Sequence, residues 1–242
     1  MRRSYASFAL TKFVFTMNLL LLGRGKMGTL VDEIARGRTH TVRIVEIDEN
    51  LHAAALTPEK LRDIDIVIDF TTPHAVMENI EGCTRCGKNL VVGTTGWYEE
   101  IPKIRQMVEN AGTGFLFASN FSIGVNLFFE IAKTASAALH LDYSGRISEC
   151  HHVHKKDAPS GTAVILGKVV QDVSGAELPI TSSREGEVVG MHQLVLESIN
   201  DTITLRHDAK SRRGFAEGAV RAAEWLQGKK GFYDFKDIWQ QL

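Results

Sequence analysis

A glycine-rich turn near the start of the chain constrains the fold more than any other feature. The apolar run 18–22 indicates a short strand, the turn Gly23-Arg-Gly-Lys-Met-Gly28 follows it, and a helix is expected over 29–36. Strand, glycine-rich turn and helix in this order form the phosphate-binding start of a dinucleotide-binding fold. Gly23 permits the tight turn, Gly25 lets the backbone approach a pyrophosphate, and Gly28 lets the helix pack close to the strand.

Strands and helices then alternate through the first half of the chain. Expected strands cover 42–47, 65–70, 89–92 and 114–118, and helices are expected over 74–86 and 98–110. This alternation predicts an α/β fold, a Rossmann-type doubly wound parallel sheet. The loops after Phe70, Val92 and Ala118 all follow the carboxyl ends of strands, where such sheets bind ligands.

An acidic residue near the end of the second strand is expected to hold the adenosine ribose. Glu46 and Asp48 both qualify, with a slight preference for Glu46. An acid at this position favours NADH, whereas Arg24 and Lys26 are placed to receive the additional phosphate of NADPH. The coenzyme preference therefore stays open, and use of both is plausible.

A second stretch, 149–163, concentrates polar chemistry, with three histidines and two lysines within six residues. A short strand is expected over 146–150, and a helix is expected to begin near Asp157 or Ser160, which are both N-cap residue types. The first N–H groups of a helix have no partner inside it and bind anions. The backbone of Gly161 and Thr162 is thus a candidate site for a carboxylate or phosphate.

Lys155 adds a positive charge and a proton to this site, and His151 or His152 can exchange a proton near neutral pH. These groups suit a small acidic substrate that gains or loses protons. A metal site is an alternative function for the histidine run. Adjacent strand residues point to opposite faces, and no second cluster is evident to complete a coordination sphere, so no metal is expected. The lysines alone are equally compatible with a solvated basic loop.

Composition narrows the class of protein. The net charge of −1 over 242 residues argues against a nucleic-acid partner, which would leave a basic surface. Three cysteines make no disulfide framework, so a cytoplasmic location is expected. No apolar run approaches the length of a membrane span, so no membrane partner is expected. Residues 1–16 precede the first strand and are expected to be a poorly ordered extension.

The stretch from Glu149 to Ala163 resembles the signature of the 4-hydroxy-tetrahydrodipicolinate reductase family, also called dihydrodipicolinate reductase. The family pattern is Glu-x-His-His-x-His-Lys-x-Asp-Ala-Pro-Ser-Gly-Thr-Ala, and this chain matches every fixed position. Lys26-Met27-Gly28 matches the end of the family's glycine-rich loop, although the loop here is one residue shorter. The resemblance extends over about 17–242.

The resemblance implies a function, NAD(P)H-dependent reduction of 4-hydroxy-tetrahydrodipicolinate in diaminopimelate and L-lysine biosynthesis. It implies that His151 is the general acid and base and that Lys155 is a second proton donor. His152, Gly161 and Thr162 would bind substrate carboxylate, with Ser160 as an additional contact. The coenzyme would contact the glycine-rich turn and Glu46, and its nicotinamide end would contact two later loops, which contribute Gly93, Thr94, Thr95, Asn120 and Phe121.

The resemblance also implies an organisation. Residues 17–119, completed by 219–242, would form the dinucleotide-binding domain. Residues 120–218 would form an α+β domain on an open mixed sheet that binds substrate and covers itself with other subunits of a homotetramer. Two rival functions remain: another Rossmann oxidoreductase acting on an amino or imino acid, and a non-catalytic NAD(P)H-binding regulator.

Overall fold

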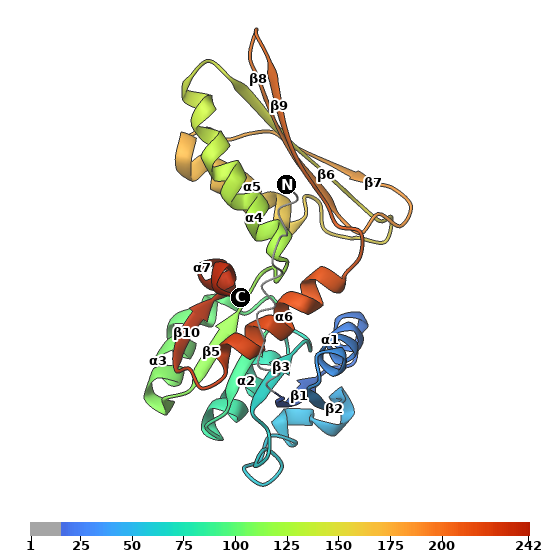
Figure 1. Ribbon diagram of the computed structural model, residues 1–242, viewed down its shortest axis with the longest axis vertical. Helices are drawn as coiled ribbons and strands as arrows, with labels where there is room; N and C mark the ends of the chain where they lie inside the picture. Colours follow the sequence, from blue (N-terminus) through green and yellow to red (C-terminus); the bar gives the residue numbers. More distant parts are fainter. Residues whose placement is uncertain (1–15) are drawn as a thin grey trace, which may run out of the picture.

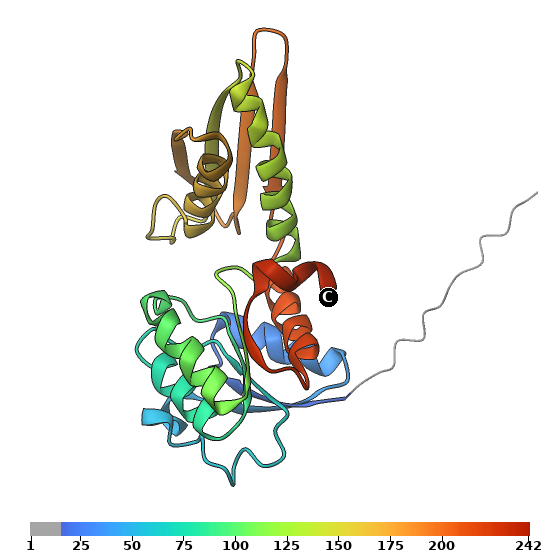
Figure 2. The same cartoon turned by 90° about the vertical axis from the view of Figure 1, so that its left-hand side faces the viewer.

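The computed structural model describes residues 16–242, which form two lobes, each built around its own sheet (Figure 1). The strand order is β10-β5-β4-β3-β1-β2 in the six-stranded sheet and β7-β6-β8-β9 in the four-stranded sheet. The view turned by 90° shows the two lobes one above the other, with α4 and α6 running toward their junction (Figure 2). Apart from Thr16, the expected N-terminal extension lies outside the described residues.

The six-stranded sheet is parallel throughout. Its strands β3 and β5 are buried along their whole length, as the apolar runs of a doubly wound sheet require. This confirms the predicted Rossmann-type fold. In chain order its elements are β1 (Asn18–Leu22), α1 (Lys26–Gly37), β2 (Thr41–Val45), β3 (Ile66–Asp69), α2 (Val76–Arg85), β4 (Asn89–Val92), α3 (Ile101–Ala111), β5 (Gly114–Phe117) and, from the C-terminal segment, β10 (Gly231–Asp234).

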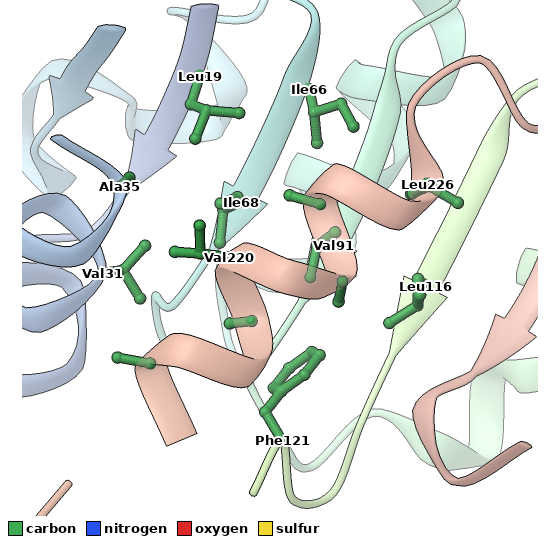
Figure 3. Packing of buried hydrophobic residues seen from close by; sticks show 14 of the residues in the cluster. Leu19, Val31, Ala35, Ile66, Ile68, Val91, Leu116, Phe121, Val220 and Leu226 are labelled. Carbon is green, nitrogen blue, oxygen red and sulfur yellow. The ribbon is translucent and has the colours of Figure 1, made fainter. Parts of the chain in front are cut away.

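Helix α6 (Arg213–Leu226) brings the C-terminal segment back onto this sheet. Its buried face is rich in alanine, so the helix lies close to the strands, and Val220 and Leu226 contact the same core as Val31 of α1 (Figure 3). Burying one such side chain stabilises the fold by about 1.5–3 kcal/mol. A second core fills the opposite face, where Ile80 of α2 and Ile104 of α3 pack. The sheet is therefore covered on both faces.

The four-stranded sheet is mixed, with β6 (Ser144–His151) parallel to β7 (Ile180–Arg184) and antiparallel to β8 (Met191–Glu197), which pairs with β9 (Thr202–Asp208). Helices α4 (Ile123–Ala135) and α5 (Gly161–Ser174) pack on one face through Phe128, Leu166 and Val170. The second α+β unit predicted from the sequence is thus confirmed.

The sequence predicts strands over 188–198 and 202–207, which correspond to β8 and β9, but it predicts neither β7 nor β10. Strand β7 is Ile-Thr-Ser-Ser-Arg, too polar to show a buried pattern, and it forms because β6 offers it a parallel edge. Strand β10 pairs with β5, far away in the sequence. Helix α7 (Phe235–Ile238) follows β10 and buries Phe235. Within residues 16–242, no helix combines the length and apolar character needed to cross a membrane.

Candidate active site

The start of α1 has the form of a phosphate site. Gly25 is the N-cap, and no side-chain hydrogen bond from the described residues caps this helix, so its first N–H groups stay available. A Cβ on Gly25 would meet nothing within 4 Å, whereas one on Gly28 would lie 2.1 Å from the Gly23 carbonyl oxygen. The turn is thus closely packed at Gly28 and open at Gly25, as the approach of a pyrophosphate requires.

A pocket of about 260 Å³ lies beside this turn, over the carboxyl ends of β1 and β2. Its lining includes Glu46 but, among the residues described, not Asp48, so Glu46 is the one of the two acids that borders the pocket. The Glu46 backbone N–H donates to Glu49 Oε2 at 3.1 Å, and Arg24 Nη1 lies 3.5 Å from Glu46 Oε1. Glu78 adds a second carboxylate to the lining. These residues fit a nucleotide with free ribose hydroxyls.

Asp69 at the end of β3 joins the loops that follow β3 and β4. Its side chain is fully buried and accepts from the Thr71 backbone N–H (2.8 Å), Asn79 Nδ2 (2.7 Å) and Thr94 Oγ1 (2.7 Å). Burial raises the pKa of Asp69, and these hydrogen bonds offset part of that shift. The Thr94 hydroxyl donates its hydrogen bond to Asp69. In this loop, the groups that remain available for a coenzyme contact are therefore backbone groups and the exposed side chain of Thr95.

The end of β6 and the start of α5 meet in the second lobe. Glu149 and His151 stand two residues apart on β6 and therefore share a face, where Glu149 Oε2 and His151 Nδ1 form a hydrogen bond. Ser160 is the N-cap of α5, and its Oγ accepts from the Ala163 N–H at 3.2 Å. The first residue of α5, Gly161, is exposed, and a Cβ there would meet nothing within 4 Å. The expected anion site is therefore open.

His192 of β8 lies directly opposite Glu149 in the sheet. Its Nε2 is 3.0 Å from Ser160 Oγ, and its ring centroid is 5.1 Å from that of His151. Burial, together with the charge of a protonated His151, lowers the pKa of His192 to about 4. Its Nδ1 has no hydrogen-bond partner within residues 16–242.

The sequence predicted that no further ligand group lies near the histidine run. This prediction is wrong. Donor atoms of Glu149, His151 and His192 all lie within 4.8 Å of one another. Strand pairing between β6 and β8 brings His192 here, and the spacing along the chain gave no sign of it. The expectation that no metal binds stays a prediction.

Lys155 and His152 lie on the loop between β6 and α5. Lys155 Nζ bonds both carboxylate oxygens of Asp157, at 2.7 and 2.8 Å, and this bond lowers the pKa of Asp157. His152 Nε2 is 3.3 Å from Arg212 Nη2. The loop thus carries cations beside the open start of α5.

The two lobes touch where the expected coenzyme and substrate residues meet. Asn120, in the loop after β5, donates from Nδ2 to Thr162 Oγ1 at 3.4 Å. Phe121 is buried, and its ring contacts those of Phe70 and Phe235, so its side chain belongs to the core. The carboxyl edge of the nucleotide sheet therefore faces the anion site of α5. Hydride delivery from one side and proton exchange from the other are compatible with this arrangement.

Family models match both lobes. "Dihydrodipicolinate reductase, N-terminus" matches residues 17–121, and "Dihydrodipicolinate reductase, C-terminus" matches residues 124–239. The chain belongs to the dihydrodipicolinate reductase family. Membership confirms the function and enzyme class expected from the sequence: the chain is an NAD(P)H-dependent oxidoreductase, a reductase of diaminopimelate and lysine biosynthesis.

Individual relatives agree. The chain is 38% identical over 240 residues to a 4-hydroxy-tetrahydrodipicolinate reductase of Christiangramia forsetii, covering 93% of this chain and 99% of the relative. It is 37% identical over 198 residues to the enzyme of that name from Neisseria meningitidis, covering 74% and 73%. A dipicolinate-bound dihydrodipicolinate reductase from Paenisporosarcina sp. TG-14 superposes with a TM-score of 0.77 at 25% identity, covering 93% of this chain and all of that one. An amine dehydrogenase from Mycobacterium smegmatis, at 10% identity and a TM-score of 0.59, shares the fold.

The sequence did not predict a role for four residues that lie at the site: Asp69, Glu149, Arg184 and His192. Asp69 and Glu149 do carry a detectable signal, because each is an acid in or at the end of an otherwise apolar strand. Arg184 and His192 lie in segments that also resemble the family, but their roles could not be assigned because their partners lie elsewhere in the sequence.

Proposed function

We propose that the chain reduces 4-hydroxy-tetrahydrodipicolinate to tetrahydrodipicolinate where the start of α5 faces Asn120. The reaction consumes the substrate, NAD(P)H and a proton, and it releases tetrahydrodipicolinate, NAD(P)⁺ and water. The bound coenzyme would supply the hydride. The observation that carries this proposal is the contact between Asn120 and Thr162, which places an anion site against the carboxyl edge of the nucleotide sheet.

The proton-handling groups are proposed to be His151 and Lys155. Burial lowers the pKa of His151, and its hydrogen bond to Glu149 offsets only part of that shift, so the free enzyme holds this ring neutral. A dicarboxylate bound nearby would favour the charged ring and prepare it to donate a proton. Lys155 would turn from Asp157 toward the substrate, adding a positive charge and a second proton.

Substrate carboxylate is proposed to bind His152 and the first backbone N–H groups of α5, at Gly161 and Thr162. Ser160 supports this site from behind: it is 2% exposed, and its hydroxyl is already bonded to the helix start and to His192. Binding of dipicolinate, a planar ring with two carboxylates, by the Paenisporosarcina enzyme is consistent with an anion site here.

The coenzyme is proposed to bind across the turn formed by Gly23, Arg24, Gly25, Lys26, Met27 and Gly28, with Glu46 on the ribose and Gly93, Thr95 and Asn120 near the nicotinamide. NADH is proposed to be preferred over NADPH. The pocket beside Glu46 is lined by two carboxylates and by no lysine or arginine among the residues described. The nearest cation, Arg24, is paired with Glu46. A phosphate on the ribose would therefore meet like charge.

A Glu46→Gln variant tests this coenzyme preference. Loss of hydrogen bonds from a charged acceptor costs about 1.5–3 kcal/mol, so kcat/KM for NADH should fall roughly 10- to 100-fold. The value for NADPH should rise or stay unchanged, because a repulsive charge is removed. Asp48→Gln is the matched control, and an equal loss for both coenzymes in Glu46→Gln would contradict the assignment.

The assembly, domain boundaries and location are also proposals. We propose a homotetramer in the cytoplasm, with a dinucleotide-binding domain of 17–119 and 219–242 and a substrate domain of 120–218. Support for the assembly comes from the face of the four-stranded sheet away from α4 and α5, where Arg146 of β6 and Thr204 and Arg206 of β9 are exposed on either side of β8. The described cysteines, all free thiols, are consistent with a reducing compartment.

The site assignment is tested by Lys155→Ala beside Lys156→Ala, a neighbouring lysine with an exposed side chain. Loss of a positioned proton donor should lower kcat of Lys155→Ala by roughly 100-fold or more, with the NADH dissociation constant unchanged. Lys156→Ala should retain wild-type kcat. Equal activity of the two variants would show that Lys155 is not the proton donor and would place this role on another group.

A further inference from the structure

A buried carboxylate lies behind the histidine that the proposed reaction uses. Glu149 is 1% exposed, and its Oε2 lies within hydrogen-bond distance of His151 Nδ1. We infer that Glu149 is a positioning residue, which holds His151 as the tautomer protonated at Nδ1 and leaves Nε2 to exchange a proton with the substrate. This inference rests on the proposed function for the identity of that proton exchange.

The contacts of the other carboxylate oxygen, Oε1, favour the ionised form of Glu149. Arg184 Nη1 donates to Oε1 at 3.0 Å, and the Ser160 backbone N–H donates to the same oxygen at 3.3 Å. Burial raises the pKa of Glu149, but its hydrogen bonds with neighbours including Arg184 outweigh burial and hold that pKa below its usual value. An ionised carboxylate can only accept. The ring nitrogen that faces it must therefore carry the hydrogen, and in a neutral ring Nε2 carries none.

Arg184 extends the same network to Lys155. Its guanidinium donates to the backbone carbonyl oxygens of Lys155, at 3.4 Å, and of Asp157. The ion pair of Glu149 and Arg184 thus holds two parts of the site: Glu149 contacts the ring of His151, and Arg184 contacts the loop that carries Lys155. Arg184 stands on β7, which pairs with β6 so that Arg184 lies beside His151.

The space around Nε2 agrees with this role. A Cβ on Gly190 would lie 3.0 Å from His151 Nε2, so the absence of a side chain there leaves that nitrogen accessible. The charged and titratable groups that face His151 are Glu149 on its own strand, Arg184 on β7, His192 on β8 and Lys155 on the loop. Of these, Glu149 is the one group positioned to stabilise the imidazolium.

A metal ion shared by Glu149, His151 and His192 is the competing explanation for the cluster. It fits the contacts less well, because both carboxylate oxygens already accept from protein donors and a guanidinium lies 3.0 Å from one of them. A cation at this carboxylate would be repelled by Arg184.

The first test needs no variant. Histidines labelled with ¹⁵N report the tautomer of each ring, and the His151 signals are assigned by their loss in His151→Asn. At neutral pH His151 of the wild-type protein should be protonated at Nδ1. A ring protonated at Nε2 would overturn the inference. So would a shift of the His151 and His192 ring signals with one equivalent of Zn²⁺, since the metal would then be the occupant.

The second test compares Glu149→Gln with Glu187→Gln, which removes an exposed carboxylate 3.8 Å from His154. Glu149→Gln should lower kcat about 10- to 100-fold, as losses of orienting partners do. Because Glu149 raises the pKa of His151, and the proposed reaction needs the protonated ring as donor, its loss should also move the alkaline limb of the kcat profile to lower pH. Glu187→Gln should change neither quantity. An unchanged limb and kcat in Glu149→Gln would overturn the inference.

The two tests separate this inference from the proposed function. An Nδ1-protonated His151 in a wild-type protein without turnover would leave the positioning intact and reject the reaction. Normal turnover with His151 protonated at Nε2 would support the reaction and reject the positioning role of Glu149. If Glu149→Gln fails to fold, the wild-type tautomer still decides.

Discussion

Three buried or half-buried histidines of the substrate lobe differ in what surrounds them. Burial lowers the pKa of His151, His192 and His207, but only His151 is bonded to a carboxylate that restores part of its basicity. His192 instead pairs with the hydroxyl that caps α5. The contrast assigns proton exchange to His151 and support of the helix start to His192.

Protonation of His192 should therefore destabilise the fold. With a pKa of about 4 in the folded chain and 6.5 in the unfolded chain, His192 contributes stability that is present above pH 6.5. As pH falls from 6.5 to 4, this stability is lost, by about 3 kcal/mol in total. Urea unfolding at several pH values measures the loss.

The control for this prediction is His192→Gln, which keeps an acceptor for Ser160 and does not titrate. Its unfolding free energy should fall less steeply between pH 6.5 and 4, although the lowered pKa values of His151 and His207 still contribute in the same direction. Parallel curves for the two proteins would show that His192 is not the titrating group.

Residue roles were predictable from the sequence where they are local. Ser160 is recognisable as an N-cap because its partner is three residues away, and the anion site at Gly161 follows from the same helix start. The bond between Ser160 and His192, and that between Glu149 and Arg184, join residues on different elements. Such pairs depend on strand pairing, which residue spacing does not encode.

At the scale of elements, the turn between β1 and α1 separates packing from binding. Gly28 contacts the backbone of Gly23, whereas Gly25 faces open space. The two glycines therefore have different functions in one short segment. The sequence predicted both roles, since the order of strand, turn and helix fixes them.

Alanine at each glycine tests this division. Gly28→Ala should destabilise the protein by about 1–3 kcal/mol, because a Cβ 2.1 Å from a carbonyl oxygen forces a shift. Gly25→Ala should change stability by less than about 1 kcal/mol and still weaken NADH binding at least roughly tenfold. Urea unfolding and NADH fluorescence titration give the two values. Similar NADH affinity in Gly25→Ala and wild type would argue against phosphate binding at this turn.

The elements that the sequence predicted are those with their own pattern. The buried strands β3, β4 and β5 show as apolar runs, and the predicted limits of β1 and β4 match the structure. Helix α6 begins at Arg213 although Gly214 has a weak helix propensity, because packing of the helix against the sheet stabilises it. Strand β10 is set by its edge position beside β5.

At the scale of the whole molecule, the chain leaves the nucleotide lobe through α4 and returns through α6, so the substrate lobe is an insertion between β5 and β10 (Figure 1). Asn120 to Thr162 is a direct side-chain contact between the lobes. The outer face of the four-stranded sheet remains polar and exposed around Thr204.

If that face is the subunit interface, light scattering should give a molar mass about four times the 26.8 kDa of one chain. Thr204→Arg, on the outer face of β9, should lower this mass by adding a charge between subunits. Lys168→Gln, on the exposed side of α5, is the control and should leave it unchanged. A monomer in the wild type would contradict the proposed assembly.

The most direct test of the account is turnover of the wild-type protein in a coupled assay. A synthase forms 4-hydroxy-tetrahydrodipicolinate from pyruvate and aspartate semialdehyde, and loss of NADH or NADPH absorbance is followed separately. The account predicts oxidation of reduced coenzyme that requires the synthase and both of its substrates, faster with NADH than with NADPH. A protein that binds NADH but oxidises neither coenzyme under these conditions would contradict it.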